Sequence, residues 1–154
     1  MNKIIIVLTS LYLLSACCSI DYPQYNDEIK KKQMQIITKI LNDNKFIETI
    51  TLDTSLSTEY FYHSVNDTGL SNYISRMKNF DCKTKFLSFE TKAVKTHDST
   101  FKIGNLYYFN NQNIDKNGET INRDLIFIFL NLNKKWYLDD ILVNESKLNK
   151  IDDN

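Results

Sequence analysis

The chain has 154 residues, and its 19 Lys and Arg side chains are balanced by 19 Asp and Glu, so the formal net charge is zero. This balance argues against a surface that binds nucleic acid, because binding to phosphates needs an excess of positive charge. With 42% hydrophobic residues but only three Gly and one Pro, the chain is expected to fold as one domain without a glycine-rich phosphate loop or a proline-rich linker.

The first sixteen residues have the pattern of an export signal. A basic start at Lys3 precedes an uncharged, mostly apolar run from Ile4 to Leu14, and small residues follow it. The run is too short for a membrane-spanning helix, which needs about twenty apolar residues. We therefore predict a signal peptide over residues 1–16.

The end of this segment, Leu14-Ser15-Ala16-Cys17, resembles the lipobox of bacterial lipoproteins. The resemblance implies cleavage after Ala16, a diacylglyceryl thioether on Cys17 and an N-acyl chain such as palmitate. Two or three acyl chains hold a protein on a membrane almost permanently. Because Cys18 stands where an Asp tends to retain lipoproteins at the inner membrane, the resemblance implies the outer membrane, facing the periplasm. A secretory signal that happens to contain a cysteine is the alternative.

After a polar tether over residues 17–26, the region from Asp27 to Asn44 predicts a helix. Its apolar residues recur at helical spacing, with lysines largely on the other face. Asn26 or Asp27 can cap the start of this helix. The apolar positions are Ile29, Ile36, Ile37, Ile40 and Leu41.

Residues 45–82 carry a weaker pattern. Phe46–Leu52 fits either a strand or the end of a helical region. Leu70–Phe80 has helical spacing, with Gly69 as a break before it and Ser71 as a candidate cap, so we predict a second helix there.

From Lys83 onward the apolar residues alternate, which is typical of strands. Leu87 and Phe89 are expected on one face of the first strand. Leu125–Leu132 is apolar on both faces, which indicates a strand covered on both sides in the middle of a sheet. Turns of hairpin length at residues 96–100 and 133–135 favour an antiparallel meander. The expected strands are 86–95, 101–110, 125–132 and 136–143.

A helical region followed by an antiparallel sheet is the order of an α+β protein. We predict a single domain over residues 27–146, in which an N-terminal helix, or several helices, packs on a curved four- to five-stranded antiparallel sheet. Residues 147–154 are expected to form a polar tail.

The segment Asp124–Ile141 is similar to the last hairpin of small nuclear transport factor 2-like proteins. In that family an apolar strand and a polar turn precede a strand that begins with Trp, as Lys135-Trp136-Tyr137-Leu138-Asp139-Asp140-Ile141 does here. The resemblance implies a cone-shaped sheet around a helix and covers about residues 27–143. A cystatin-like fold, with a helix on a four-stranded sheet, is the alternative.

The residues that carry chemistry form no catalytic or metal-binding pattern. His63 and His97 stand outside any motif, and a structural role is expected for both. Asp139 and Asp140 are adjacent in a predicted strand, so their side chains are expected on opposite faces, one exposed and one in a polar network. Cys18 and Cys82 lack the spacing of metal ligands. We therefore predict no metal and no cofactor.

Two runs of three aromatic residues, 60–62 and 107–109, are the one enrichment that suggests a binding surface. Three consecutive aromatics in a strand place at least one on the face opposite the core, and exposed aromatics are enriched at binding surfaces. Coverage of both faces by other elements is the alternative. The candidate surface residues are Tyr60, Tyr62, Tyr107 and Tyr108.

These features predict a cell-envelope lipoprotein, anchored in the membrane through Cys17, whose domain binds an unidentified envelope protein or small ligand without catalysis. An immunity protein and an envelope accessory factor are two concrete forms. The alternative is a pocket enzyme of the nuclear transport factor 2-like kind that acts on a small hydrophobic molecule. Such an enzyme needs a carboxylate or His in an enclosed cavity beside a Tyr hydroxyl.

Overall fold

The computed structural model describes residues 27–78, 80, 84–115 and 117–148. The predicted signal peptide, the lipidation site Cys17, the tether and Cys82 lie outside the described residues. The last strand continues to Leu148, two residues into the predicted polar tail, and residues 149–154 are not described.

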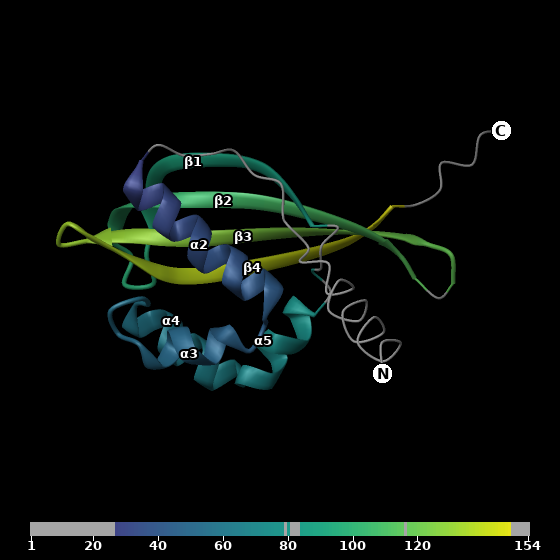
Figure 1. Cartoon of the computed structure of the whole chain (residues 1–154), viewed down its shortest axis with the longest axis horizontal. Coiled ribbons are helices and arrows are strands. Elements are labelled where there is room, and N and C mark those ends of the chain that lie inside the picture. The colour runs from purple at the N-terminus through teal and green to yellow at the C-terminus, as the bar shows by residue number, and fades with distance from the viewer. Residues whose placement is uncertain (1–26, 79, 81–83, 116, 149–154) are drawn as a thin grey trace, which may run out of the picture.

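The described chain is an α+β structure, as predicted. Its helices come first: α2 (Glu28–Asn42), α3 (Phe46–Leu52), α4 (Glu59–Thr68) and α5 (Leu70–Met77). They precede a four-stranded antiparallel sheet in the order β1-β2-β3-β4, made of β1 (Lys85–Lys95), β2 (Phe101–Ile114), β3 (Thr120–Leu132) and β4 (Lys135–Leu148). α2 crosses one face of the sheet, and α3, α4 and α5 lie together beside β4 (Figure 1).

α2 confirms the helix predicted from the spacing of apolar residues. Asp27 caps it, because its Oδ1 atom accepts hydrogen bonds from the backbone N–H groups of Ile29 (2.8 Å) and Lys30 (3.2 Å). Ile37 and Ile40 are fully buried against the sheet, whereas Ile29 is 43% exposed. The buried stripe of α2 thus fixes which face of the sheet becomes the core.

The segment between α2 and the sheet is more helical than its sequence pattern indicated. Phe46–Leu52 is the helix α3, and the aromatic run at residues 60–62 lies in α4 rather than in a strand. Thr58 and Gly69 bracket α4, and the Thr58 side chain caps its start by accepting a hydrogen bond from Phe61 N. The candidate cap Ser71 is wrong, because α5 begins directly after Gly69 without a side-chain cap.

The face of the sheet toward α2, called the inner face here, carries the main core. Tyr107 and Phe109 of β2 and Phe127 and Phe129 of β3 alternate along their strands and are almost completely buried. They pack against Met34, Ile37, Ile40, Ile47, Ile50 and Phe61 of the helices. The alternation predicted for these strands therefore holds in the middle of the sheet.

The opposite, outer face carries a smaller apolar cluster. Leu106, Ile128 and Leu130 are buried there, with Val94 and Tyr108 packed beside them. This cluster contains no residue of the described helices. The sequence predicted that Leu125–Leu132 is covered on both faces. Among the described residues, helices cover its inner face, and no described helix contributes to the cluster on its outer face.

A bulge in β1 changes the predicted faces of that strand. The register shifts between Phe86, opposite Phe109, and Ser88, opposite Tyr108. Leu87 is the extra residue and is 58% exposed, while Phe86 and Phe89 both pack against the main core. The expectation that Leu87 and Phe89 share a face is therefore wrong.

Candidate functional site

Two adjoining cavities lie along the first turn of α4, with volumes of about 700 Å³ and about 550 Å³. Thr58, Glu59, His63 and Leu132 line both, so they form one groove, called the α4 groove here. The larger part is also lined by Thr51, Leu52, Thr54, Ser57, Tyr62 and Tyr137, and the smaller part by Tyr60, Thr96, His97, Asp98, Lys102, Leu130 and Asp139.

The hairpin between β1 and β2 supplies one wall of the groove. β1 and β4 are opposite edges of the sheet, yet the tip of this hairpin bends toward α4 (Figure 1), where the His97 ring stacks on Tyr60 with centroids 4.9 Å apart. Asp98 orders the tip, since its carboxylate accepts hydrogen bonds from Thr96, from the Thr100 hydroxyl and from the Thr100 backbone. These bonds lower the pKa of Asp98 to about 2, so it is ionised at neutral pH.

The start of α4 is held against β4 by backbone and side-chain hydrogen bonds. Thr58 N donates to Leu138 O (2.9 Å), and Leu138 N donates to Leu56 O (2.8 Å). The Thr58 hydroxyl accepts from Phe61 N (3.1 Å) and donates to Asp139 Oδ1 (2.8 Å). One side chain therefore both caps the helix and places Asp139 at the positive end of the helix dipole.

Asp139 is an extra residue in β4. Ile128 is opposite Asp140 and Phe129 is opposite Leu138, which leaves Asp139 without a partner in β3. A bulge breaks the alternation of side chains, so the expectation that Asp139 and Asp140 point to opposite faces, one of them exposed, is wrong. Both are half-buried, and the negative charge of each raises the pKa of Tyr60 in α4.

Burial dominates the electrostatics of this acidic pair. Desolvation raises the pKa of both carboxyl groups, and the charge of Asp140 raises the pKa of Asp139 further. Hydrogen bonds oppose the shift, from Thr58 at Asp139 and from Ile141 N and the Tyr73 hydroxyl at Asp140. The pKa of Tyr60 is raised by its own burial and then by the two carboxylates.

The four tyrosines predicted as a binding surface do not lie together. Tyr60 and Tyr62 line the α4 groove and are 36% and 40% exposed. Tyr107 is fully buried on the inner face, because it alternates with Phe109, and its hydroxyl donates to Gln33 Oε1 (2.7 Å). Its assignment to a binding surface is therefore wrong.

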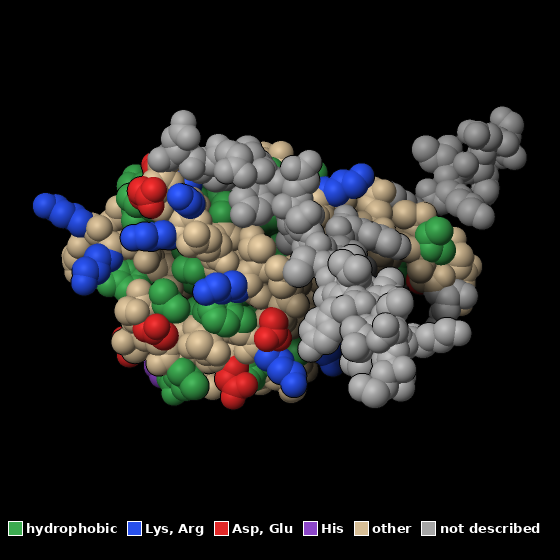
Figure 2. All heavy atoms as spheres, viewed as in Figure 1, with side chains coloured by type: hydrophobic (Ala, Val, Ile, Leu, Met, Phe, Trp, Pro, Cys, Tyr) green, Lys and Arg blue, Asp and Glu red, His purple; other side chains and the backbone are tan. Residues whose placement is uncertain are grey.

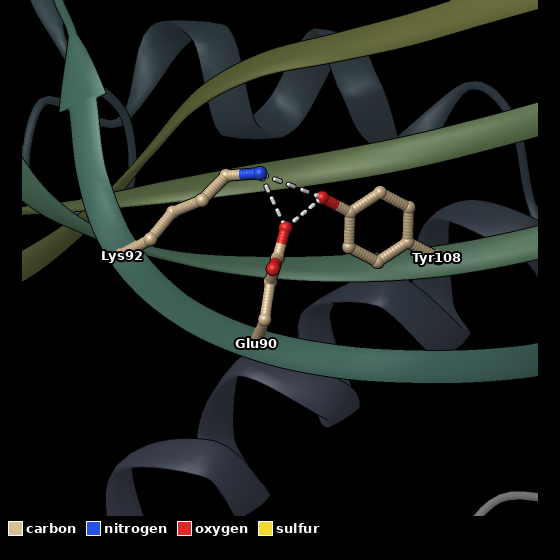
Figure 3. Close-up of polar contacts among 3 residues, drawn as sticks. All are labelled: Glu90, Lys92 and Tyr108. Carbon is tan, nitrogen blue, oxygen red and sulfur yellow. Dashed lines mark hydrogen bonds and ion pairs between the residues drawn. The ribbon is translucent and has the colours of Figure 1, made fainter.

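Tyr108 lies on the outer face, away from the groove. Its hydroxyl bonds to Glu90 and lies 3.2 Å from Lys92 Nζ, and Lys92 also pairs with Glu90 (Figure 3). The pKa of Glu90 is lowered by its hydrogen bonds to Lys92 and Tyr108. Because the side chains of Lys92 and Glu90 are 49% and 43% exposed, solvent screens their attraction and this arrangement contributes little to stability. The structure brings no further site residue to it.

Sequence reasoning missed Thr58, His97 and Asp139 as members of one site. They come from a helix cap, a hairpin tip and a strand bulge, and none of these belongs to a motif. The one usable signal was Thr58 with Gly69 eleven residues later, a capping residue and a stop that predict α4.

Several broader features bear on function. Basic and acidic side chains are interspersed on the face shown in Figure 2. Among the described residues, no group of three or more His, Cys, Asp or Glu side chains is placed to hold a metal ion. None of the described helices is long and apolar enough to cross a membrane.

Comparisons with family models, with curated proteins and with solved structures found no match.

Proposed function

We propose that the protein is an exported cell-envelope lipoprotein, anchored through Cys17 in the outer membrane facing the periplasm, whose α+β domain binds a partner without catalysis. The single observation that carries the anchor is Leu14-Ser15-Ala16-Cys17 directly behind an export signal. Lipidation at Cys17 would hold the domain close to the membrane surface, because only residues 18–27 separate Cys17 from α2.

The α4 groove supports the binding role. It presents partly exposed tyrosines, Tyr60 and Tyr62, on a helix that a buried cap and a backbone pairing hold against β4. Tyrosines that are exposed and already ordered lose little conformational entropy when a partner covers them. An immunity protein against a delivered toxin and an envelope accessory factor are the two roles that this arrangement suits.

The domain is further proposed to be nuclear transport factor 2-like. The support is the order of helices before a curved antiparallel meander and the Trp136 strand that closes it. The cystatin-like alternative has one helix on the sheet, whereas α3, α4 and α5 add a helical layer beside β4 (Figure 1).

Processing of the full chain tests the anchor. The wild-type protein is expected in the membrane fraction with a mass increased by the lipid, and globomycin should cause the unprocessed precursor to accumulate. Cys17→Ser should release the protein to the soluble fraction, while the matched control Cys18→Ser should leave it membrane-bound. An unmodified polypeptide in the soluble fraction of wild-type cells would refute the proposal.

Cross-linking in cells tests the binding role. Tyr62→p-benzoylphenylalanine places a photoreactive group in the groove, and Ile114→p-benzoylphenylalanine is the control, because Ile114 is exposed at the other end of β2. A discrete product at position 62 that Tyr60→Ala abolishes is expected. The absence of any product at position 62 under conditions where the protein is anchored would contradict a groove-bound partner.

One observation favours the second candidate, a pocket enzyme that acts on a small hydrophobic molecule. Asp139, a carboxyl group with a raised pKa, lines the groove beside Tyr60, as a general acid or base would. The inner face, where a cone-shaped sheet would hold a substrate, is instead filled by Tyr107, Phe109 and Phe127. Turnover of a hydrophobic ketone or alcohol that Asp139→Asn abolishes would establish this candidate.

A further inference from the structure

The charges along the α4 groove are not balanced. Glu59, Asp98 and Asp139 line it, and among the described lining residues Lys102 is the one Lys or Arg. The positive charge of Lys102 helps to lower the pKa of Asp98. The groove therefore differs from the face in Figure 2, where basic and acidic side chains are interspersed.

Among the described residues that line the groove, Asp139 is the carboxylate without a Lys, Arg or His partner. Within the described residues it accepts its side-chain hydrogen bond from Thr58, at Oδ1, and no Lys or Arg forms an ion pair with it. Asp140 adds a second negative charge close behind it. A half-buried carboxylate that lies near a second carboxylate and has no ion pair carries a desolvation cost, and a bound cation offsets that cost.

Aromatic and aliphatic side chains line part of the cavity that holds Asp139. They are Tyr60 and His97, whose rings stack on each other, together with Leu130 and Leu132. A guanidinium group suits such walls better than an ammonium group, because it is planar, weakly hydrated and stacks on aromatic rings while it binds a carboxylate with two N–H groups. Tyr137 and Leu52 extend the apolar lining into the larger cavity.

We infer that the α4 groove receives an arginine side chain, flanked by apolar residues, from a segment of a partner protein, with Asp139 as its carboxylate contact and Tyr60 and His97 as its stacking surface. The inference deepens the proposed binding role and rests on it. Charge complementarity selects this occupant, since an uncharged hydrophobic molecule would leave the carboxylates of Asp139 and Asp140 buried without compensation.

The test uses the full lipidated chain in detergent micelles and a fluorescein-labelled peptide, Ala-Leu-Arg-Leu-Ala, followed by fluorescence anisotropy. The same peptide with citrulline in place of arginine keeps the shape and removes the charge. We expect the arginine peptide to bind about tenfold or more tightly than the citrulline peptide, the usual scale for a charge-assisted hydrogen bond. A lysine peptide should fall between the two.

Variants locate the contact. Asp139→Asn keeps an acceptor for Thr58 and removes the charge, so it should reduce the affinity for the arginine peptide about tenfold and leave the citrulline peptide unaffected. Asp67→Asn is the control for loss of a carboxylate, because Asp67 lies exposed near the end of α4, outside the groove lining. Circular dichroism of each variant establishes that it is folded.

Equal affinity for the arginine and citrulline peptides, or equal loss in Asp139→Asn and Asp67→Asn, would overturn the inference. If the groove cross-link at position 62 persists in that case, the binding role stands and the class of partner is wrong. If the cross-link is absent as well, both proposals fail. Tight binding of the citrulline peptide alone would indicate an uncharged occupant and would also overturn the inference.

Discussion

The inner face of the sheet and the α4 groove differ in how their residues are placed. On the inner face, Phe109, Phe127 and Phe129 occupy alternate positions of regular strands, and each is at most 1% exposed. In the groove, Thr58, His97 and Asp139 come from a helix cap, a hairpin tip and a bulge, where the regular pattern ends or breaks.

Because of this difference, the inner face contributes mainly to the stability of the fold, whereas the groove keeps side chains accessible to a partner. The inner face is closed, so its side chains gain dispersion and hydrophobic energy and offer nothing to a ligand. The groove leaves carboxylates and aromatic rings partly solvated, which contributes less to folding but keeps them accessible. Substitutions on the inner face should therefore lower stability more than substitutions in the groove.

The largest effect is expected in the core. Phe127→Ala removes a fully buried ring that packs edge-on against Phe109, with centroids 5.7 Å apart. We expect a loss of about 3–5 kcal/mol in the free energy of unfolding, measured by urea denaturation of the full chain. Phe101→Ala, at a 67% exposed position, should lose well under 1 kcal/mol. Similar losses in the two variants would contradict the assignment of the inner face as the core.

A buried polar contact under α2 should come next. Gln33 Oε1 accepts from Asn105 Nδ2 (2.9 Å) and from the Tyr107 hydroxyl (2.7 Å). Gln33→Leu leaves both donors buried without this acceptor, so a loss of about 2–4 kcal/mol is expected in urea denaturation. The exposed neighbour on the same helix, Gln35→Leu, is the control and should change stability by less than about 0.5 kcal/mol.

The junction of the two regions is the Thr58 hydroxyl. Thr58→Ala removes both the cap of α4 and the donor to Asp139, and should cost about 1–2 kcal/mol. Thr58→Ser keeps the hydroxyl and should recover most of that loss. Thermal unfolding of the two variants side by side measures the difference, and equal melting temperatures would show that the hydroxyl contributes nothing.

The smallest effect is a pH dependence at the acidic pair Asp139 and Asp140. Because burial raises the folded-state pKa of Asp139 and Asp140 above the ordinary value of 3.8, the folded protein binds protons more tightly than the unfolded chain. Their contribution to stability therefore falls as pH rises from 3.8 through the raised pKa values. Asp140→Asn should gain stability relative to wild type over that range, in denaturation curves at several pH values. A constant difference across the range would contradict the raised pKa.

The contrast between regions also explains what the sequence could predict. The α+β order, the capped helix at Asp27 and the burial of Phe109 and Phe127 follow from periodicity, which depends on each element alone. The stacking of His97 on Tyr60 and the bulge at Asp139 depend on how separate elements meet, and single-residue insertions in strands carry no local pattern. The sequence therefore contains the individual residues of the groove but does not show that the fold brings them together.

Both edges of the sheet are interrupted. β1 carries its bulge at Leu87, β4 carries one at Asp139, and the edge of β4 is occupied at Leu138 by the backbone around Ser57. An intact edge strand is a template on which another chain can add a strand and begin to aggregate. The same irregularity that shapes the groove thus shortens the stretch of edge strand available for such addition, a protection that would matter most if the proposed lipid anchor holds copies together in one bilayer.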